Sequence, residues 1–255
     1  MSLQFNDSVA SKGLVQQYEF EIGANAADVS GNTTRLKQFA AAVNIAYDNF
    51  LRIALNASGT WQFDDSNQTD YPIITTNLVS GQRDYSFTTD GSGNLILDIY
   101  RVFVADSSGV FSEIYPVDVQ EPRSDTVSFA DGRNASGTPT RYDKTANSIF
   151  LDVIPSYNYT NGLKLYVNRE PSYFVYTDTT KKPGVPGDLH KYFYLKPAAE
   201  HARRNNLANK NDLANEVLKM EGDDLRNIPG TIGTYFASRN RDERKRLAVS
   251  QPDNR

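Results

Sequence analysis

Two histidines are the residues best suited by type to acid–base or metal chemistry. His190 and His201 are eleven positions apart, about three helical turns, so they share one side of a helix unless Pro197 breaks the register. Zinc sites on a helix pair two histidines four residues apart with a neighbouring glutamate, and the sequence lacks that pattern. The sequence therefore predicts no metal site at the histidines.

Oxygen ligands cluster at Asp64, Asp65, Asn67 and Asp70, where the spacing resembles that of a calcium-binding loop. The glycine and the terminal glutamate of such a loop are missing. We therefore expect these side chains to form turns and helix caps rather than to bind a cation.

The sequence also lacks the common signatures of catalysis. It contains no cysteine, which excludes disulfides, thiolate catalysis and cysteine-ligated zinc. It has neither a Gly-x-Ser-x-Gly nucleophile elbow nor a glycine-rich phosphate loop. We expect no catalytic residue and no cofactor, although the 31 acidic residues leave open a hydrolase that uses two carboxylates in a cleft.

Positive charge gathers toward the C-terminus. Residues 56–180 carry 16 acidic and 8 basic side chains, whereas residues 181–220 carry 8 basic and 4 acidic ones. This split suits contact between unlike surfaces or docking on an acidic partner; a chance distribution of solvated side chains is the alternative. Because Asp242 and Glu243 interrupt the last basic cluster, a docking or solvated helix is favoured there over nucleic-acid recognition. The candidate interface residues are Arg203, Arg204, Arg239, Arg241, Arg244, Lys245 and Arg246.

A helix over residues 33–55 is the clearest element. It opens at Asn32-Thr33-Thr34, three residues that favour the N-cap position, and it ends at Ser58-Gly59. Its apolar residues recur at helical spacing and predict one buried stripe over five turns. These residues are Leu36, Phe39, Ala40, Val43, Tyr47, Phe50, Leu51 and Ala54.

A second helical region covers residues 188–220. Asp188 is expected to cap it, and Pro197 either to kink it or to divide it into two helices. Ala198, Ala199 and Ala202 are expected to allow close packing on a neighbouring helix. Within it, Asn211-Asp212 is expected to cap a segment that ends at Gly222. We expect this region to pack against the helix over residues 33–55.

The residues between these two helical regions are predicted to form β structure. Short alternating runs separated by turn residues are typical of a small antiparallel sandwich or barrel. Asn161-Gly162, between two such runs, is the strongest hairpin signal.

The breaker cluster Lys182–Gly187 marks the predicted seam between β and helical architecture. Its seam residues are Pro183, Gly184, Pro186 and Gly187. The predicted fold class is α+β, a helical bundle with an inserted antiparallel β-sandwich or barrel-like domain and an extended C-terminal tail. The predicted divisions are an N-terminal segment with the first bundle helix (1–58), an inserted β domain (59–180), the C-terminal bundle helices (181–235) and a docking tail (236–255).

Four strings in sequence order resemble the head-to-tail adaptor, or connector, proteins of tailed bacteriophages. Together they span roughly residues 35–205, which leaves the N-terminal segment and the arginine-rich end outside the resemblance. The strings are Trp61–Ile73, Leu78–Tyr85, Gly137–Tyr142 with Ile149–Leu151 and Pro155, and Pro183–His190 leading into the alanine-rich helix.

The resemblance implies a structural virion protein without enzymatic activity. Such adaptors form a ring, by resemblance a dodecamer, beneath the portal protein and join the capsid to a tail or nozzle protein. DNA passes through the channel without sequence-specific recognition, and C-terminal tails commonly dock on the portal. The expected location is the head–tail junction of the virion, after assembly in the host cytoplasm. No run of about 18 apolar residues and no signal pattern occurs, so no membrane role is expected.

Two rival functions remain. The tyrosine content suits a β-sandwich binding module of a virion fibre or a carbohydrate-binding protein, although the strong helix over residues 33–55 argues against it. A cell-wall hydrolase is the third possibility. The sequence specifies neither the ring size, the host, nor which surface meets which partner.

Overall fold

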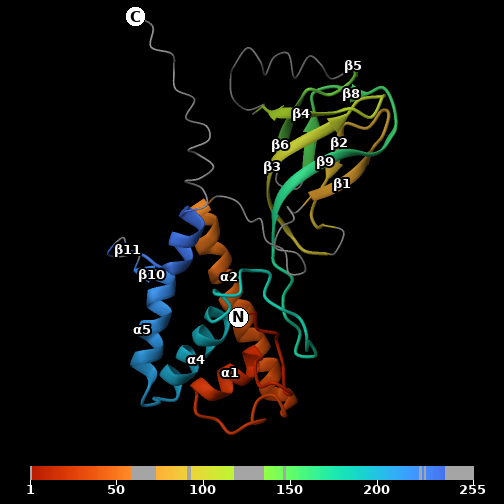
Figure 1. Cartoon of the computed structure of the whole chain (residues 1–255). Coiled ribbons are helices and arrows are strands. Elements are labelled where there is room, and N and C mark those ends of the chain that lie inside the picture. Colours follow the sequence, from red (N-terminus) through yellow and green to blue (C-terminus); the bar gives the residue numbers. More distant parts are fainter. Residues whose placement is uncertain are drawn as a thin grey trace, which may run out of the picture. The chain divides into compact units, whose positions relative to one another are not determined.

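The protein is mixed α/β, with helices and one curled seven-stranded sheet. In the computed structural model the chain divides into two compact units (Figure 1). The helical unit comprises Met1–Thr69 and Pro171–Arg255, and the β unit comprises Asp70–Glu170. The structure describes residues 2–58, 73–90, 93–117, 135–145, 148–223, 226 and 228–238.

The helical unit is built from helices and one small hairpin. A further helical segment covers residues 231–238. The named elements are α1 (Leu14–Glu21), α2 (Thr33–Ser58), α4 (Tyr192–Arg204), α5 (Lys210–Glu221), β10 (Gly222–Asp223) and β11 (Ile228–Pro229).

The N-cap and the buried stripe of helix α2 agree with the predictions made from its sequence. The Oδ1 atom of Asn32 accepts hydrogen bonds from the backbone N–H groups of Thr34 and Arg35 at 3.0 and 3.2 Å. An asparagine that accepts from the first turn in this way is an effective N-cap. Every residue of the predicted apolar stripe is buried. The predicted helix, including its end at Ser58, is confirmed.

Aromatic side chains join α2 to α4. The ring of Phe50 lies 5.8 Å from that of Tyr192 and 5.3 Å from that of Phe193, and Tyr47 meets Phe193 at 4.8 Å between centroids. All four side chains are almost fully buried. The predicted packing of the first helix on the later helical region is therefore confirmed for α4.

The N-terminal segment, which the resemblance left unassigned, belongs to this core. The backbone N–H of Phe5 donates to the carbonyl of Lys181 at 2.7 Å, and its ring stacks on Phe174 at 5.0 Å. Phe5 and Leu3 are buried in the same apolar cluster as α2. The two sequence-distant parts of the helical unit thus share one core.

Two local predictions in the helical unit need correction. Helix α4 begins at Tyr192 rather than just after Asp188, because successive turns occupy the intervening residues, with the Leu189 N–H bonded to the Pro186 carbonyl. The N-cap of α5 is Asn209 rather than Asn211 or Asp212. Helix α4 continues through Pro197 to Arg204 as one element.

The β unit contains one large sheet with strand order β1-β9-β3-β4-β6-β7-β2, together with a separate β5–β8 pair. Its core lies on the face that carries Val102, Val104, Leu163 and Leu165, all essentially buried. The strands are β1 (Ile73–Leu78), β2 (Asp84–Ser86), β3 (Ile96–Ala105), β4 (Phe111–Pro116), β5 (Ser136–Gly137), β6 (Arg141–Thr145), β7 (Ser148–Leu151), β8 (Ile154–Pro155) and β9 (Tyr159–Arg169).

The sequence predicted a purely antiparallel arrangement, and the structure contradicts this. Strands β4 and β6 pair in parallel, with Tyr115 opposite Arg141. The short β5–β8 pair is also parallel. Parallel neighbours need a crossover connection rather than a tight turn, and residues 117–140 provide the chain length for one between β4 and β6. Alternation within single strands does not reveal this pairing.

The hairpin prediction at Asn161-Gly162 is wrong. Both residues lie inside β9, where the pairing with β1 shifts between Thr76 and Leu78. Asn161 has φ of 54°, and its backbone N–H donates to the side chain of Asn77 at 2.9 Å. A Cβ on Gly162 would lie 2.8 Å from that of Leu78. The dipeptide therefore forms a bulge, which uses the same left-handed conformation as a hairpin turn.

The division between the units also differs from the predicted boundaries. Pro171–Thr180 belong to the helical unit, although they had been assigned to the inserted β domain. Phe236, assigned to the docking tail, is 3% exposed and packs on Phe50 at 5.9 Å between ring centroids.

Candidate functional site

Arg203 and Arg204, two of the predicted interface residues, lie in the last turn of α4 and are exposed. Basic residues are favourable there because they face the negative end of the helix dipole. The only counter-charge contact of Arg204 among the described residues is with Glu200, one helical turn away, at 3.8 Å. An exposed ion pair of this kind contributes little free energy, so it fixes the arginine side chain only weakly.

The fold brings Arg35 of α2 to the same place. Arg35 and Arg204 both act electrostatically on the ring of His201 and on the hydroxyl of Tyr18, from α1. His201 meets Tyr18 edge to face at 6.0 Å between centroids. We call Arg35, His201, Arg203 and Arg204 the basic patch. It combines parts of the chain about 170 residues apart.

The charge of the patch comes from its three arginines, and Glu200 beside Arg204 partly offsets it. Burial lowers the pKa of His201, and the positive charges of Arg35 and Arg204 lower it further. The first turn of α2, which holds Arg35, contains no acidic residue to offset the positive end of that helix dipole. A surface of this composition is suited to contact with carboxylates or phosphates.

The predicted seam lies within the helical unit and not at the boundary between the units, which falls at Glu170 and Pro171. Pro183 and Gly184 are buried, whereas Pro186 and Gly187 are partly buried. The N–H of Gly184 donates to the Tyr47 hydroxyl of α2 at 2.8 Å. This turn anchors the chain to the helical core.

His190 is fully buried beside that turn. Its Nδ1 accepts the backbone N–H of Leu3 at 2.9 Å, and its Nε2 lies 2.9 Å from the carbonyl of Val185. These partners require a neutral ring with the proton on Nε2. Burial lowers the pKa of His190, so the folded state favours this neutral form. His190 is therefore structural, and it does not share a helix face with His201.

The two histidines predict how stability depends on pH. Their folded pKa values lie below the ordinary 6.5, so the unfolded chain takes up protons first as the pH falls. The free energy of unfolding should be at its full value well above pH 6.5 and should decline as the pH is lowered through and below 6.5. Urea titrations across this window should show that slope, and His190→Gln should flatten it. A stability that rises on acidification in this window would contradict the assignment.

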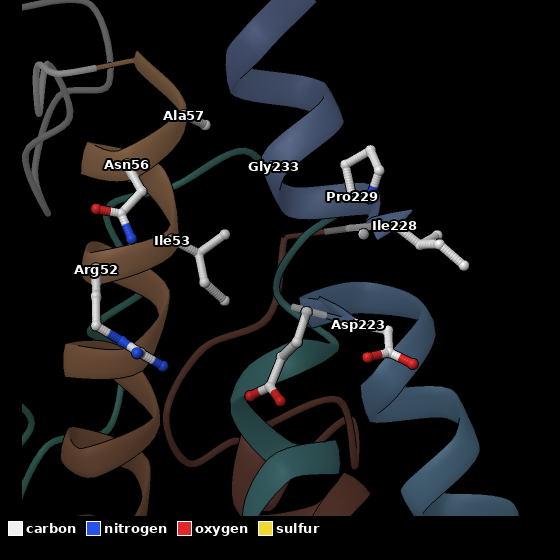
Figure 2. A pocket seen from close by; sticks show the side chains of 10 residues that line it. Arg52, Ile53, Asn56, Ala57, Asp223, Ile228, Pro229 and Gly233 are labelled. Carbon is white, nitrogen blue, oxygen red and sulfur yellow. The ribbon is translucent and has the colours of Figure 1, made fainter. Parts of the chain in front are cut away.

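A pocket of about 480 Å³ lies between the C-terminal half of α2 and the β10–β11 hairpin (Figure 2). Ile53 and Pro229 provide apolar walls, and Arg52 and Asp223 bring opposite charges to its lining. The Asp223 carboxylate also lies 3.4 Å from Arg226.

Glu221, which also lines this pocket, is held by two donors. Its Oε1 accepts the Tyr192 hydroxyl at 2.6 Å and lies 2.8 Å from Nζ of Lys196. Burial, followed by the contact with Glu221, strongly raises the pKa of Tyr192, which therefore stays a proton donor. The three side chains join α4 to the end of α5, a structural role.

The other predicted interface residues, Arg239, Arg241, Arg244, Lys245 and Arg246, lie outside the described residues, as does the aspartate cluster at 64–70. Within the described part of the chain, no group of three or more His, Asp and Glu side chains could hold a metal ion. Among the described helices, none is long and apolar enough to cross a membrane.

Comparison with protein-family models finds no match, and comparison with curated proteins finds no similar protein. The sequence analysis did not identify Arg35 and His201 as members of the basic patch. The one local sequence feature that pointed to Arg35 was the lack of an acidic residue in the first turn of α2, where acidic residues are favoured.

Proposed function

We propose that this protein is a head-to-tail adaptor of a tailed bacteriophage. It forms a ring beneath the portal protein and joins the capsid to the tail around the DNA channel. The observation that carries the proposal is the insertion of the β unit, Asp70–Glu170, between α2 and α4, which pack into one core. The adaptors that the sequence resembles have a helical bundle interrupted in this way by a β domain.

The charge distribution is consistent with ring assembly. A closed ring uses a heterologous interface, in which one surface of each subunit meets a different surface of its neighbour. The basic patch is one such surface. The β unit, with 13 acidic and 8 basic residues in 70–170, supplies charge of the opposite sign.

By the same resemblance, the partners are the portal protein on one side and a tail or nozzle protein on the other. Twelve copies form the ring, and DNA passes through without base-specific contacts. The protein belongs to the head–tail junction of the virion and has no catalytic role of its own.

The C-terminal residues supply the attachment to the portal in this proposal. Deleting residues 240–255 should abolish co-sedimentation with purified portal rings, because this removes five of the six basic residues of 239–255. The melting temperature should stay nearly unchanged, because the cut falls after Phe236, the last buried aromatic side chain among the described residues.

The matched control is a full-length variant with Arg241, Arg244, Lys245 and Arg246 replaced by Gln. It keeps the chain length but loses the charge, so it should also lose attachment. Failure of the truncated chain to fold would show that the segment is part of the core. Undiminished co-sedimentation of the truncated chain would disprove its docking role.

One observation favours the rival function, a β binding module. The outer face of the sheet carries aromatic rings, Phe103, Tyr166 and Phe111, of the kind that could stack on sugars. Cations already lie over these rings, with Arg101 5.0 Å from Phe103 and Lys164 3.8 Å from Phe111. Monomeric glycan binding without portal binding would favour the rival, and clearing of cell walls would favour a hydrolase.

A further inference from the structure

Phe20 is the one phenylalanine among the described residues whose side chain is exposed. It lies in α1 and is 77% exposed. The helix that carries it is held firmly, because Tyr18 and Glu19 are buried in the helical unit. The Glu19 carboxylate accepts the backbone N–H groups of Val29 and Ser30, both at 2.7 Å. An aromatic ring fixed in solvent in this way is well suited to a protein interface, where aromatic side chains contribute much of the apolar contact.

The pocket between α2 and the β10–β11 hairpin has the apolar walls that such a ring needs. Figure 2 shows Ile53 on the α2 side of the pocket and Ile228 and Pro229 on the hairpin side. Ile228 is 56% exposed, so this wall is largely open to solvent. The pocket measures about 480 Å³, and an apolar cavity of about 150 Å³ is enough to hold benzene. A phenyl ring placed between the two walls would cover both.

Phe20 does not enter the pocket of its own copy. The carbonyl of Glu21, the next residue, accepts the side-chain amide of Asn209 at 2.8 Å at the start of α5. The hairpin follows the opposite end of α5, after Glu221, and Figure 1 shows α1 and the hairpin well apart in the helical unit. Moving Phe20 to this pocket would pull the buried residues of α1 out of the core. A ring that fills the pocket therefore comes from another molecule, and every copy of this chain carries one.

Opposite charges lie beside the ring and beside the pocket. Glu21 makes no ion pair with the described residues, and burial, together with the nearby Glu216, raises the pKa of its carboxyl. Arg52, which lines the pocket, is exposed and likewise has no ion pair within the described chain. Because Phe20 and Glu21 are adjacent, a copy that inserts the ring also brings a carboxylate to this guanidinium. This complementarity favours a second copy as the occupant of the pocket.

We infer that Phe20 of one copy inserts into the pocket between α2 and the β10–β11 hairpin of a second copy. The ring and the pocket are different surfaces of the chain, so the contact is heterologous and repeats from copy to copy until a ring of subunits closes. The inference rests on the proposed function, because it assigns the contact between neighbouring subunits of the adaptor ring.

The absence of cysteine allows a direct test by cross-linking. The test variant combines Gln17→Cys, one helical turn before Phe20, with Ile228→Cys at the pocket, so the inserting ring stays intact. Mild oxidation with copper phenanthroline should give a ladder of disulfide-linked dimers, trimers and larger species, whereas neither single variant should form a ladder. Because a specific contact raises the local thiol concentration to the millimolar range, the ladder should be at least about ten times stronger than from random collision.

The matched control is Gln17→Cys with Ile45→Cys, because Ile45 is also 56% exposed but does not line the pocket. Phe20→Ala, added to the Gln17→Cys and Ile228→Cys pair, should lower the ladder to the level of this control. Phe20→Leu keeps apolar bulk and should retain part of the ladder. The melting temperature of the alanine variant should stay nearly unchanged, because Phe20 is exposed in the single copy.

The two charges give a second test in the same cysteine background. Arg52→Glu should weaken the ladder several-fold at low salt, because it places two carboxylates opposite each other. Glu21→Arg alone should also weaken it. The two changes together should restore most of the ladder, because they exchange the partners of the same ion pair. The reactions are run both on free protein and on protein bound to portal rings.

A ladder no stronger than the control in both settings overturns the inference. Cross-linking that stops at dimers also overturns it, because that result indicates a two-fold contact. So do a ladder that Phe20→Ala leaves undiminished and a charge exchange that restores nothing. Co-sedimentation with portal is measured separately. Portal binding without the ladder refutes this contact and leaves the adaptor function standing, whereas a ladder without portal binding supports the contact and contradicts the adaptor function.

Discussion

Replacing Phe39 with Asp should unfold the helical unit. Phe39 is 3% exposed and meets Tyr18 at 4.6 Å and Phe5 at 5.9 Å between ring centroids. The variant loses these aromatic contacts and leaves a carboxylate without a partner in an apolar core. We expect a loss of about 3 kcal/mol or more in the free energy of unfolding, measured by urea titration of the helical circular dichroism signal.

Ile45→Asp is the matched control, because Ile45 lies on the same helix and is 56% exposed. Its cost should stay near about 0.5 kcal/mol, as for other surface substitutions. Hydrogen exchange of β9 should remain slow in the Phe39 variant, since the β unit has its own apolar core. An unchanged melting temperature would show that α2 does not hold the core together.

The second large effect is expected in the β unit. Asp152 is 5% exposed and accepts hydrogen bonds from the N–H and hydroxyl of Thr140 and from the N–H of Val153. Asp152→Ala removes the one buried carboxylate that accepts from these three donors. We expect a loss of about 2–4 kcal/mol, read from the exchange rates of β6 and β7 amides.

Asp152→Asn distinguishes the contribution of the hydrogen bonds that Asp152 accepts from the contribution of its charge. Asparagine keeps one carbonyl oxygen for the backbone donors but loses the attraction to Arg141, whose Nε lies 3.8 Å away. It should therefore cost less than the alanine variant. Equal costs for the two variants would show that charge, rather than hydrogen bonding, sets the contribution of Asp152.

Elements with strong local signals could be predicted from the sequence. Helix α2 has both a cap at Asn32 and a continuous apolar stripe, so its bounds follow from local chemistry. Helix α5 ends at Gly222, as expected, and Gly222 has φ of 94°. Near Gly222 the backbone is so close to Gly230 that a Cβ there would lie 2.5 Å from the Gly230 nitrogen.

Features that depend on distant contacts could not be predicted in this way. Asn161-Gly162 has the conformation of a hairpin turn, and only its pairing with β1 shows that it is a bulge. The basic patch depends on the packing of α1, α2 and α4, which brings Arg35 to Arg204. Phe236 appeared to begin a charged tail because its partner, Phe50, is 186 residues earlier in the chain.

The mass of the complex with portal is the measurement that tests the central claim most directly. Purified portal rings are mixed with an excess of the full chain, and the assemblies are weighed by native mass spectrometry. The adaptor function predicts a single new species in which each portal ring has gained a complete ring of this protein, twelve copies by the family resemblance. Portal rings that gain no mass, or that gain a scattered and incomplete number of copies at saturation, would contradict it.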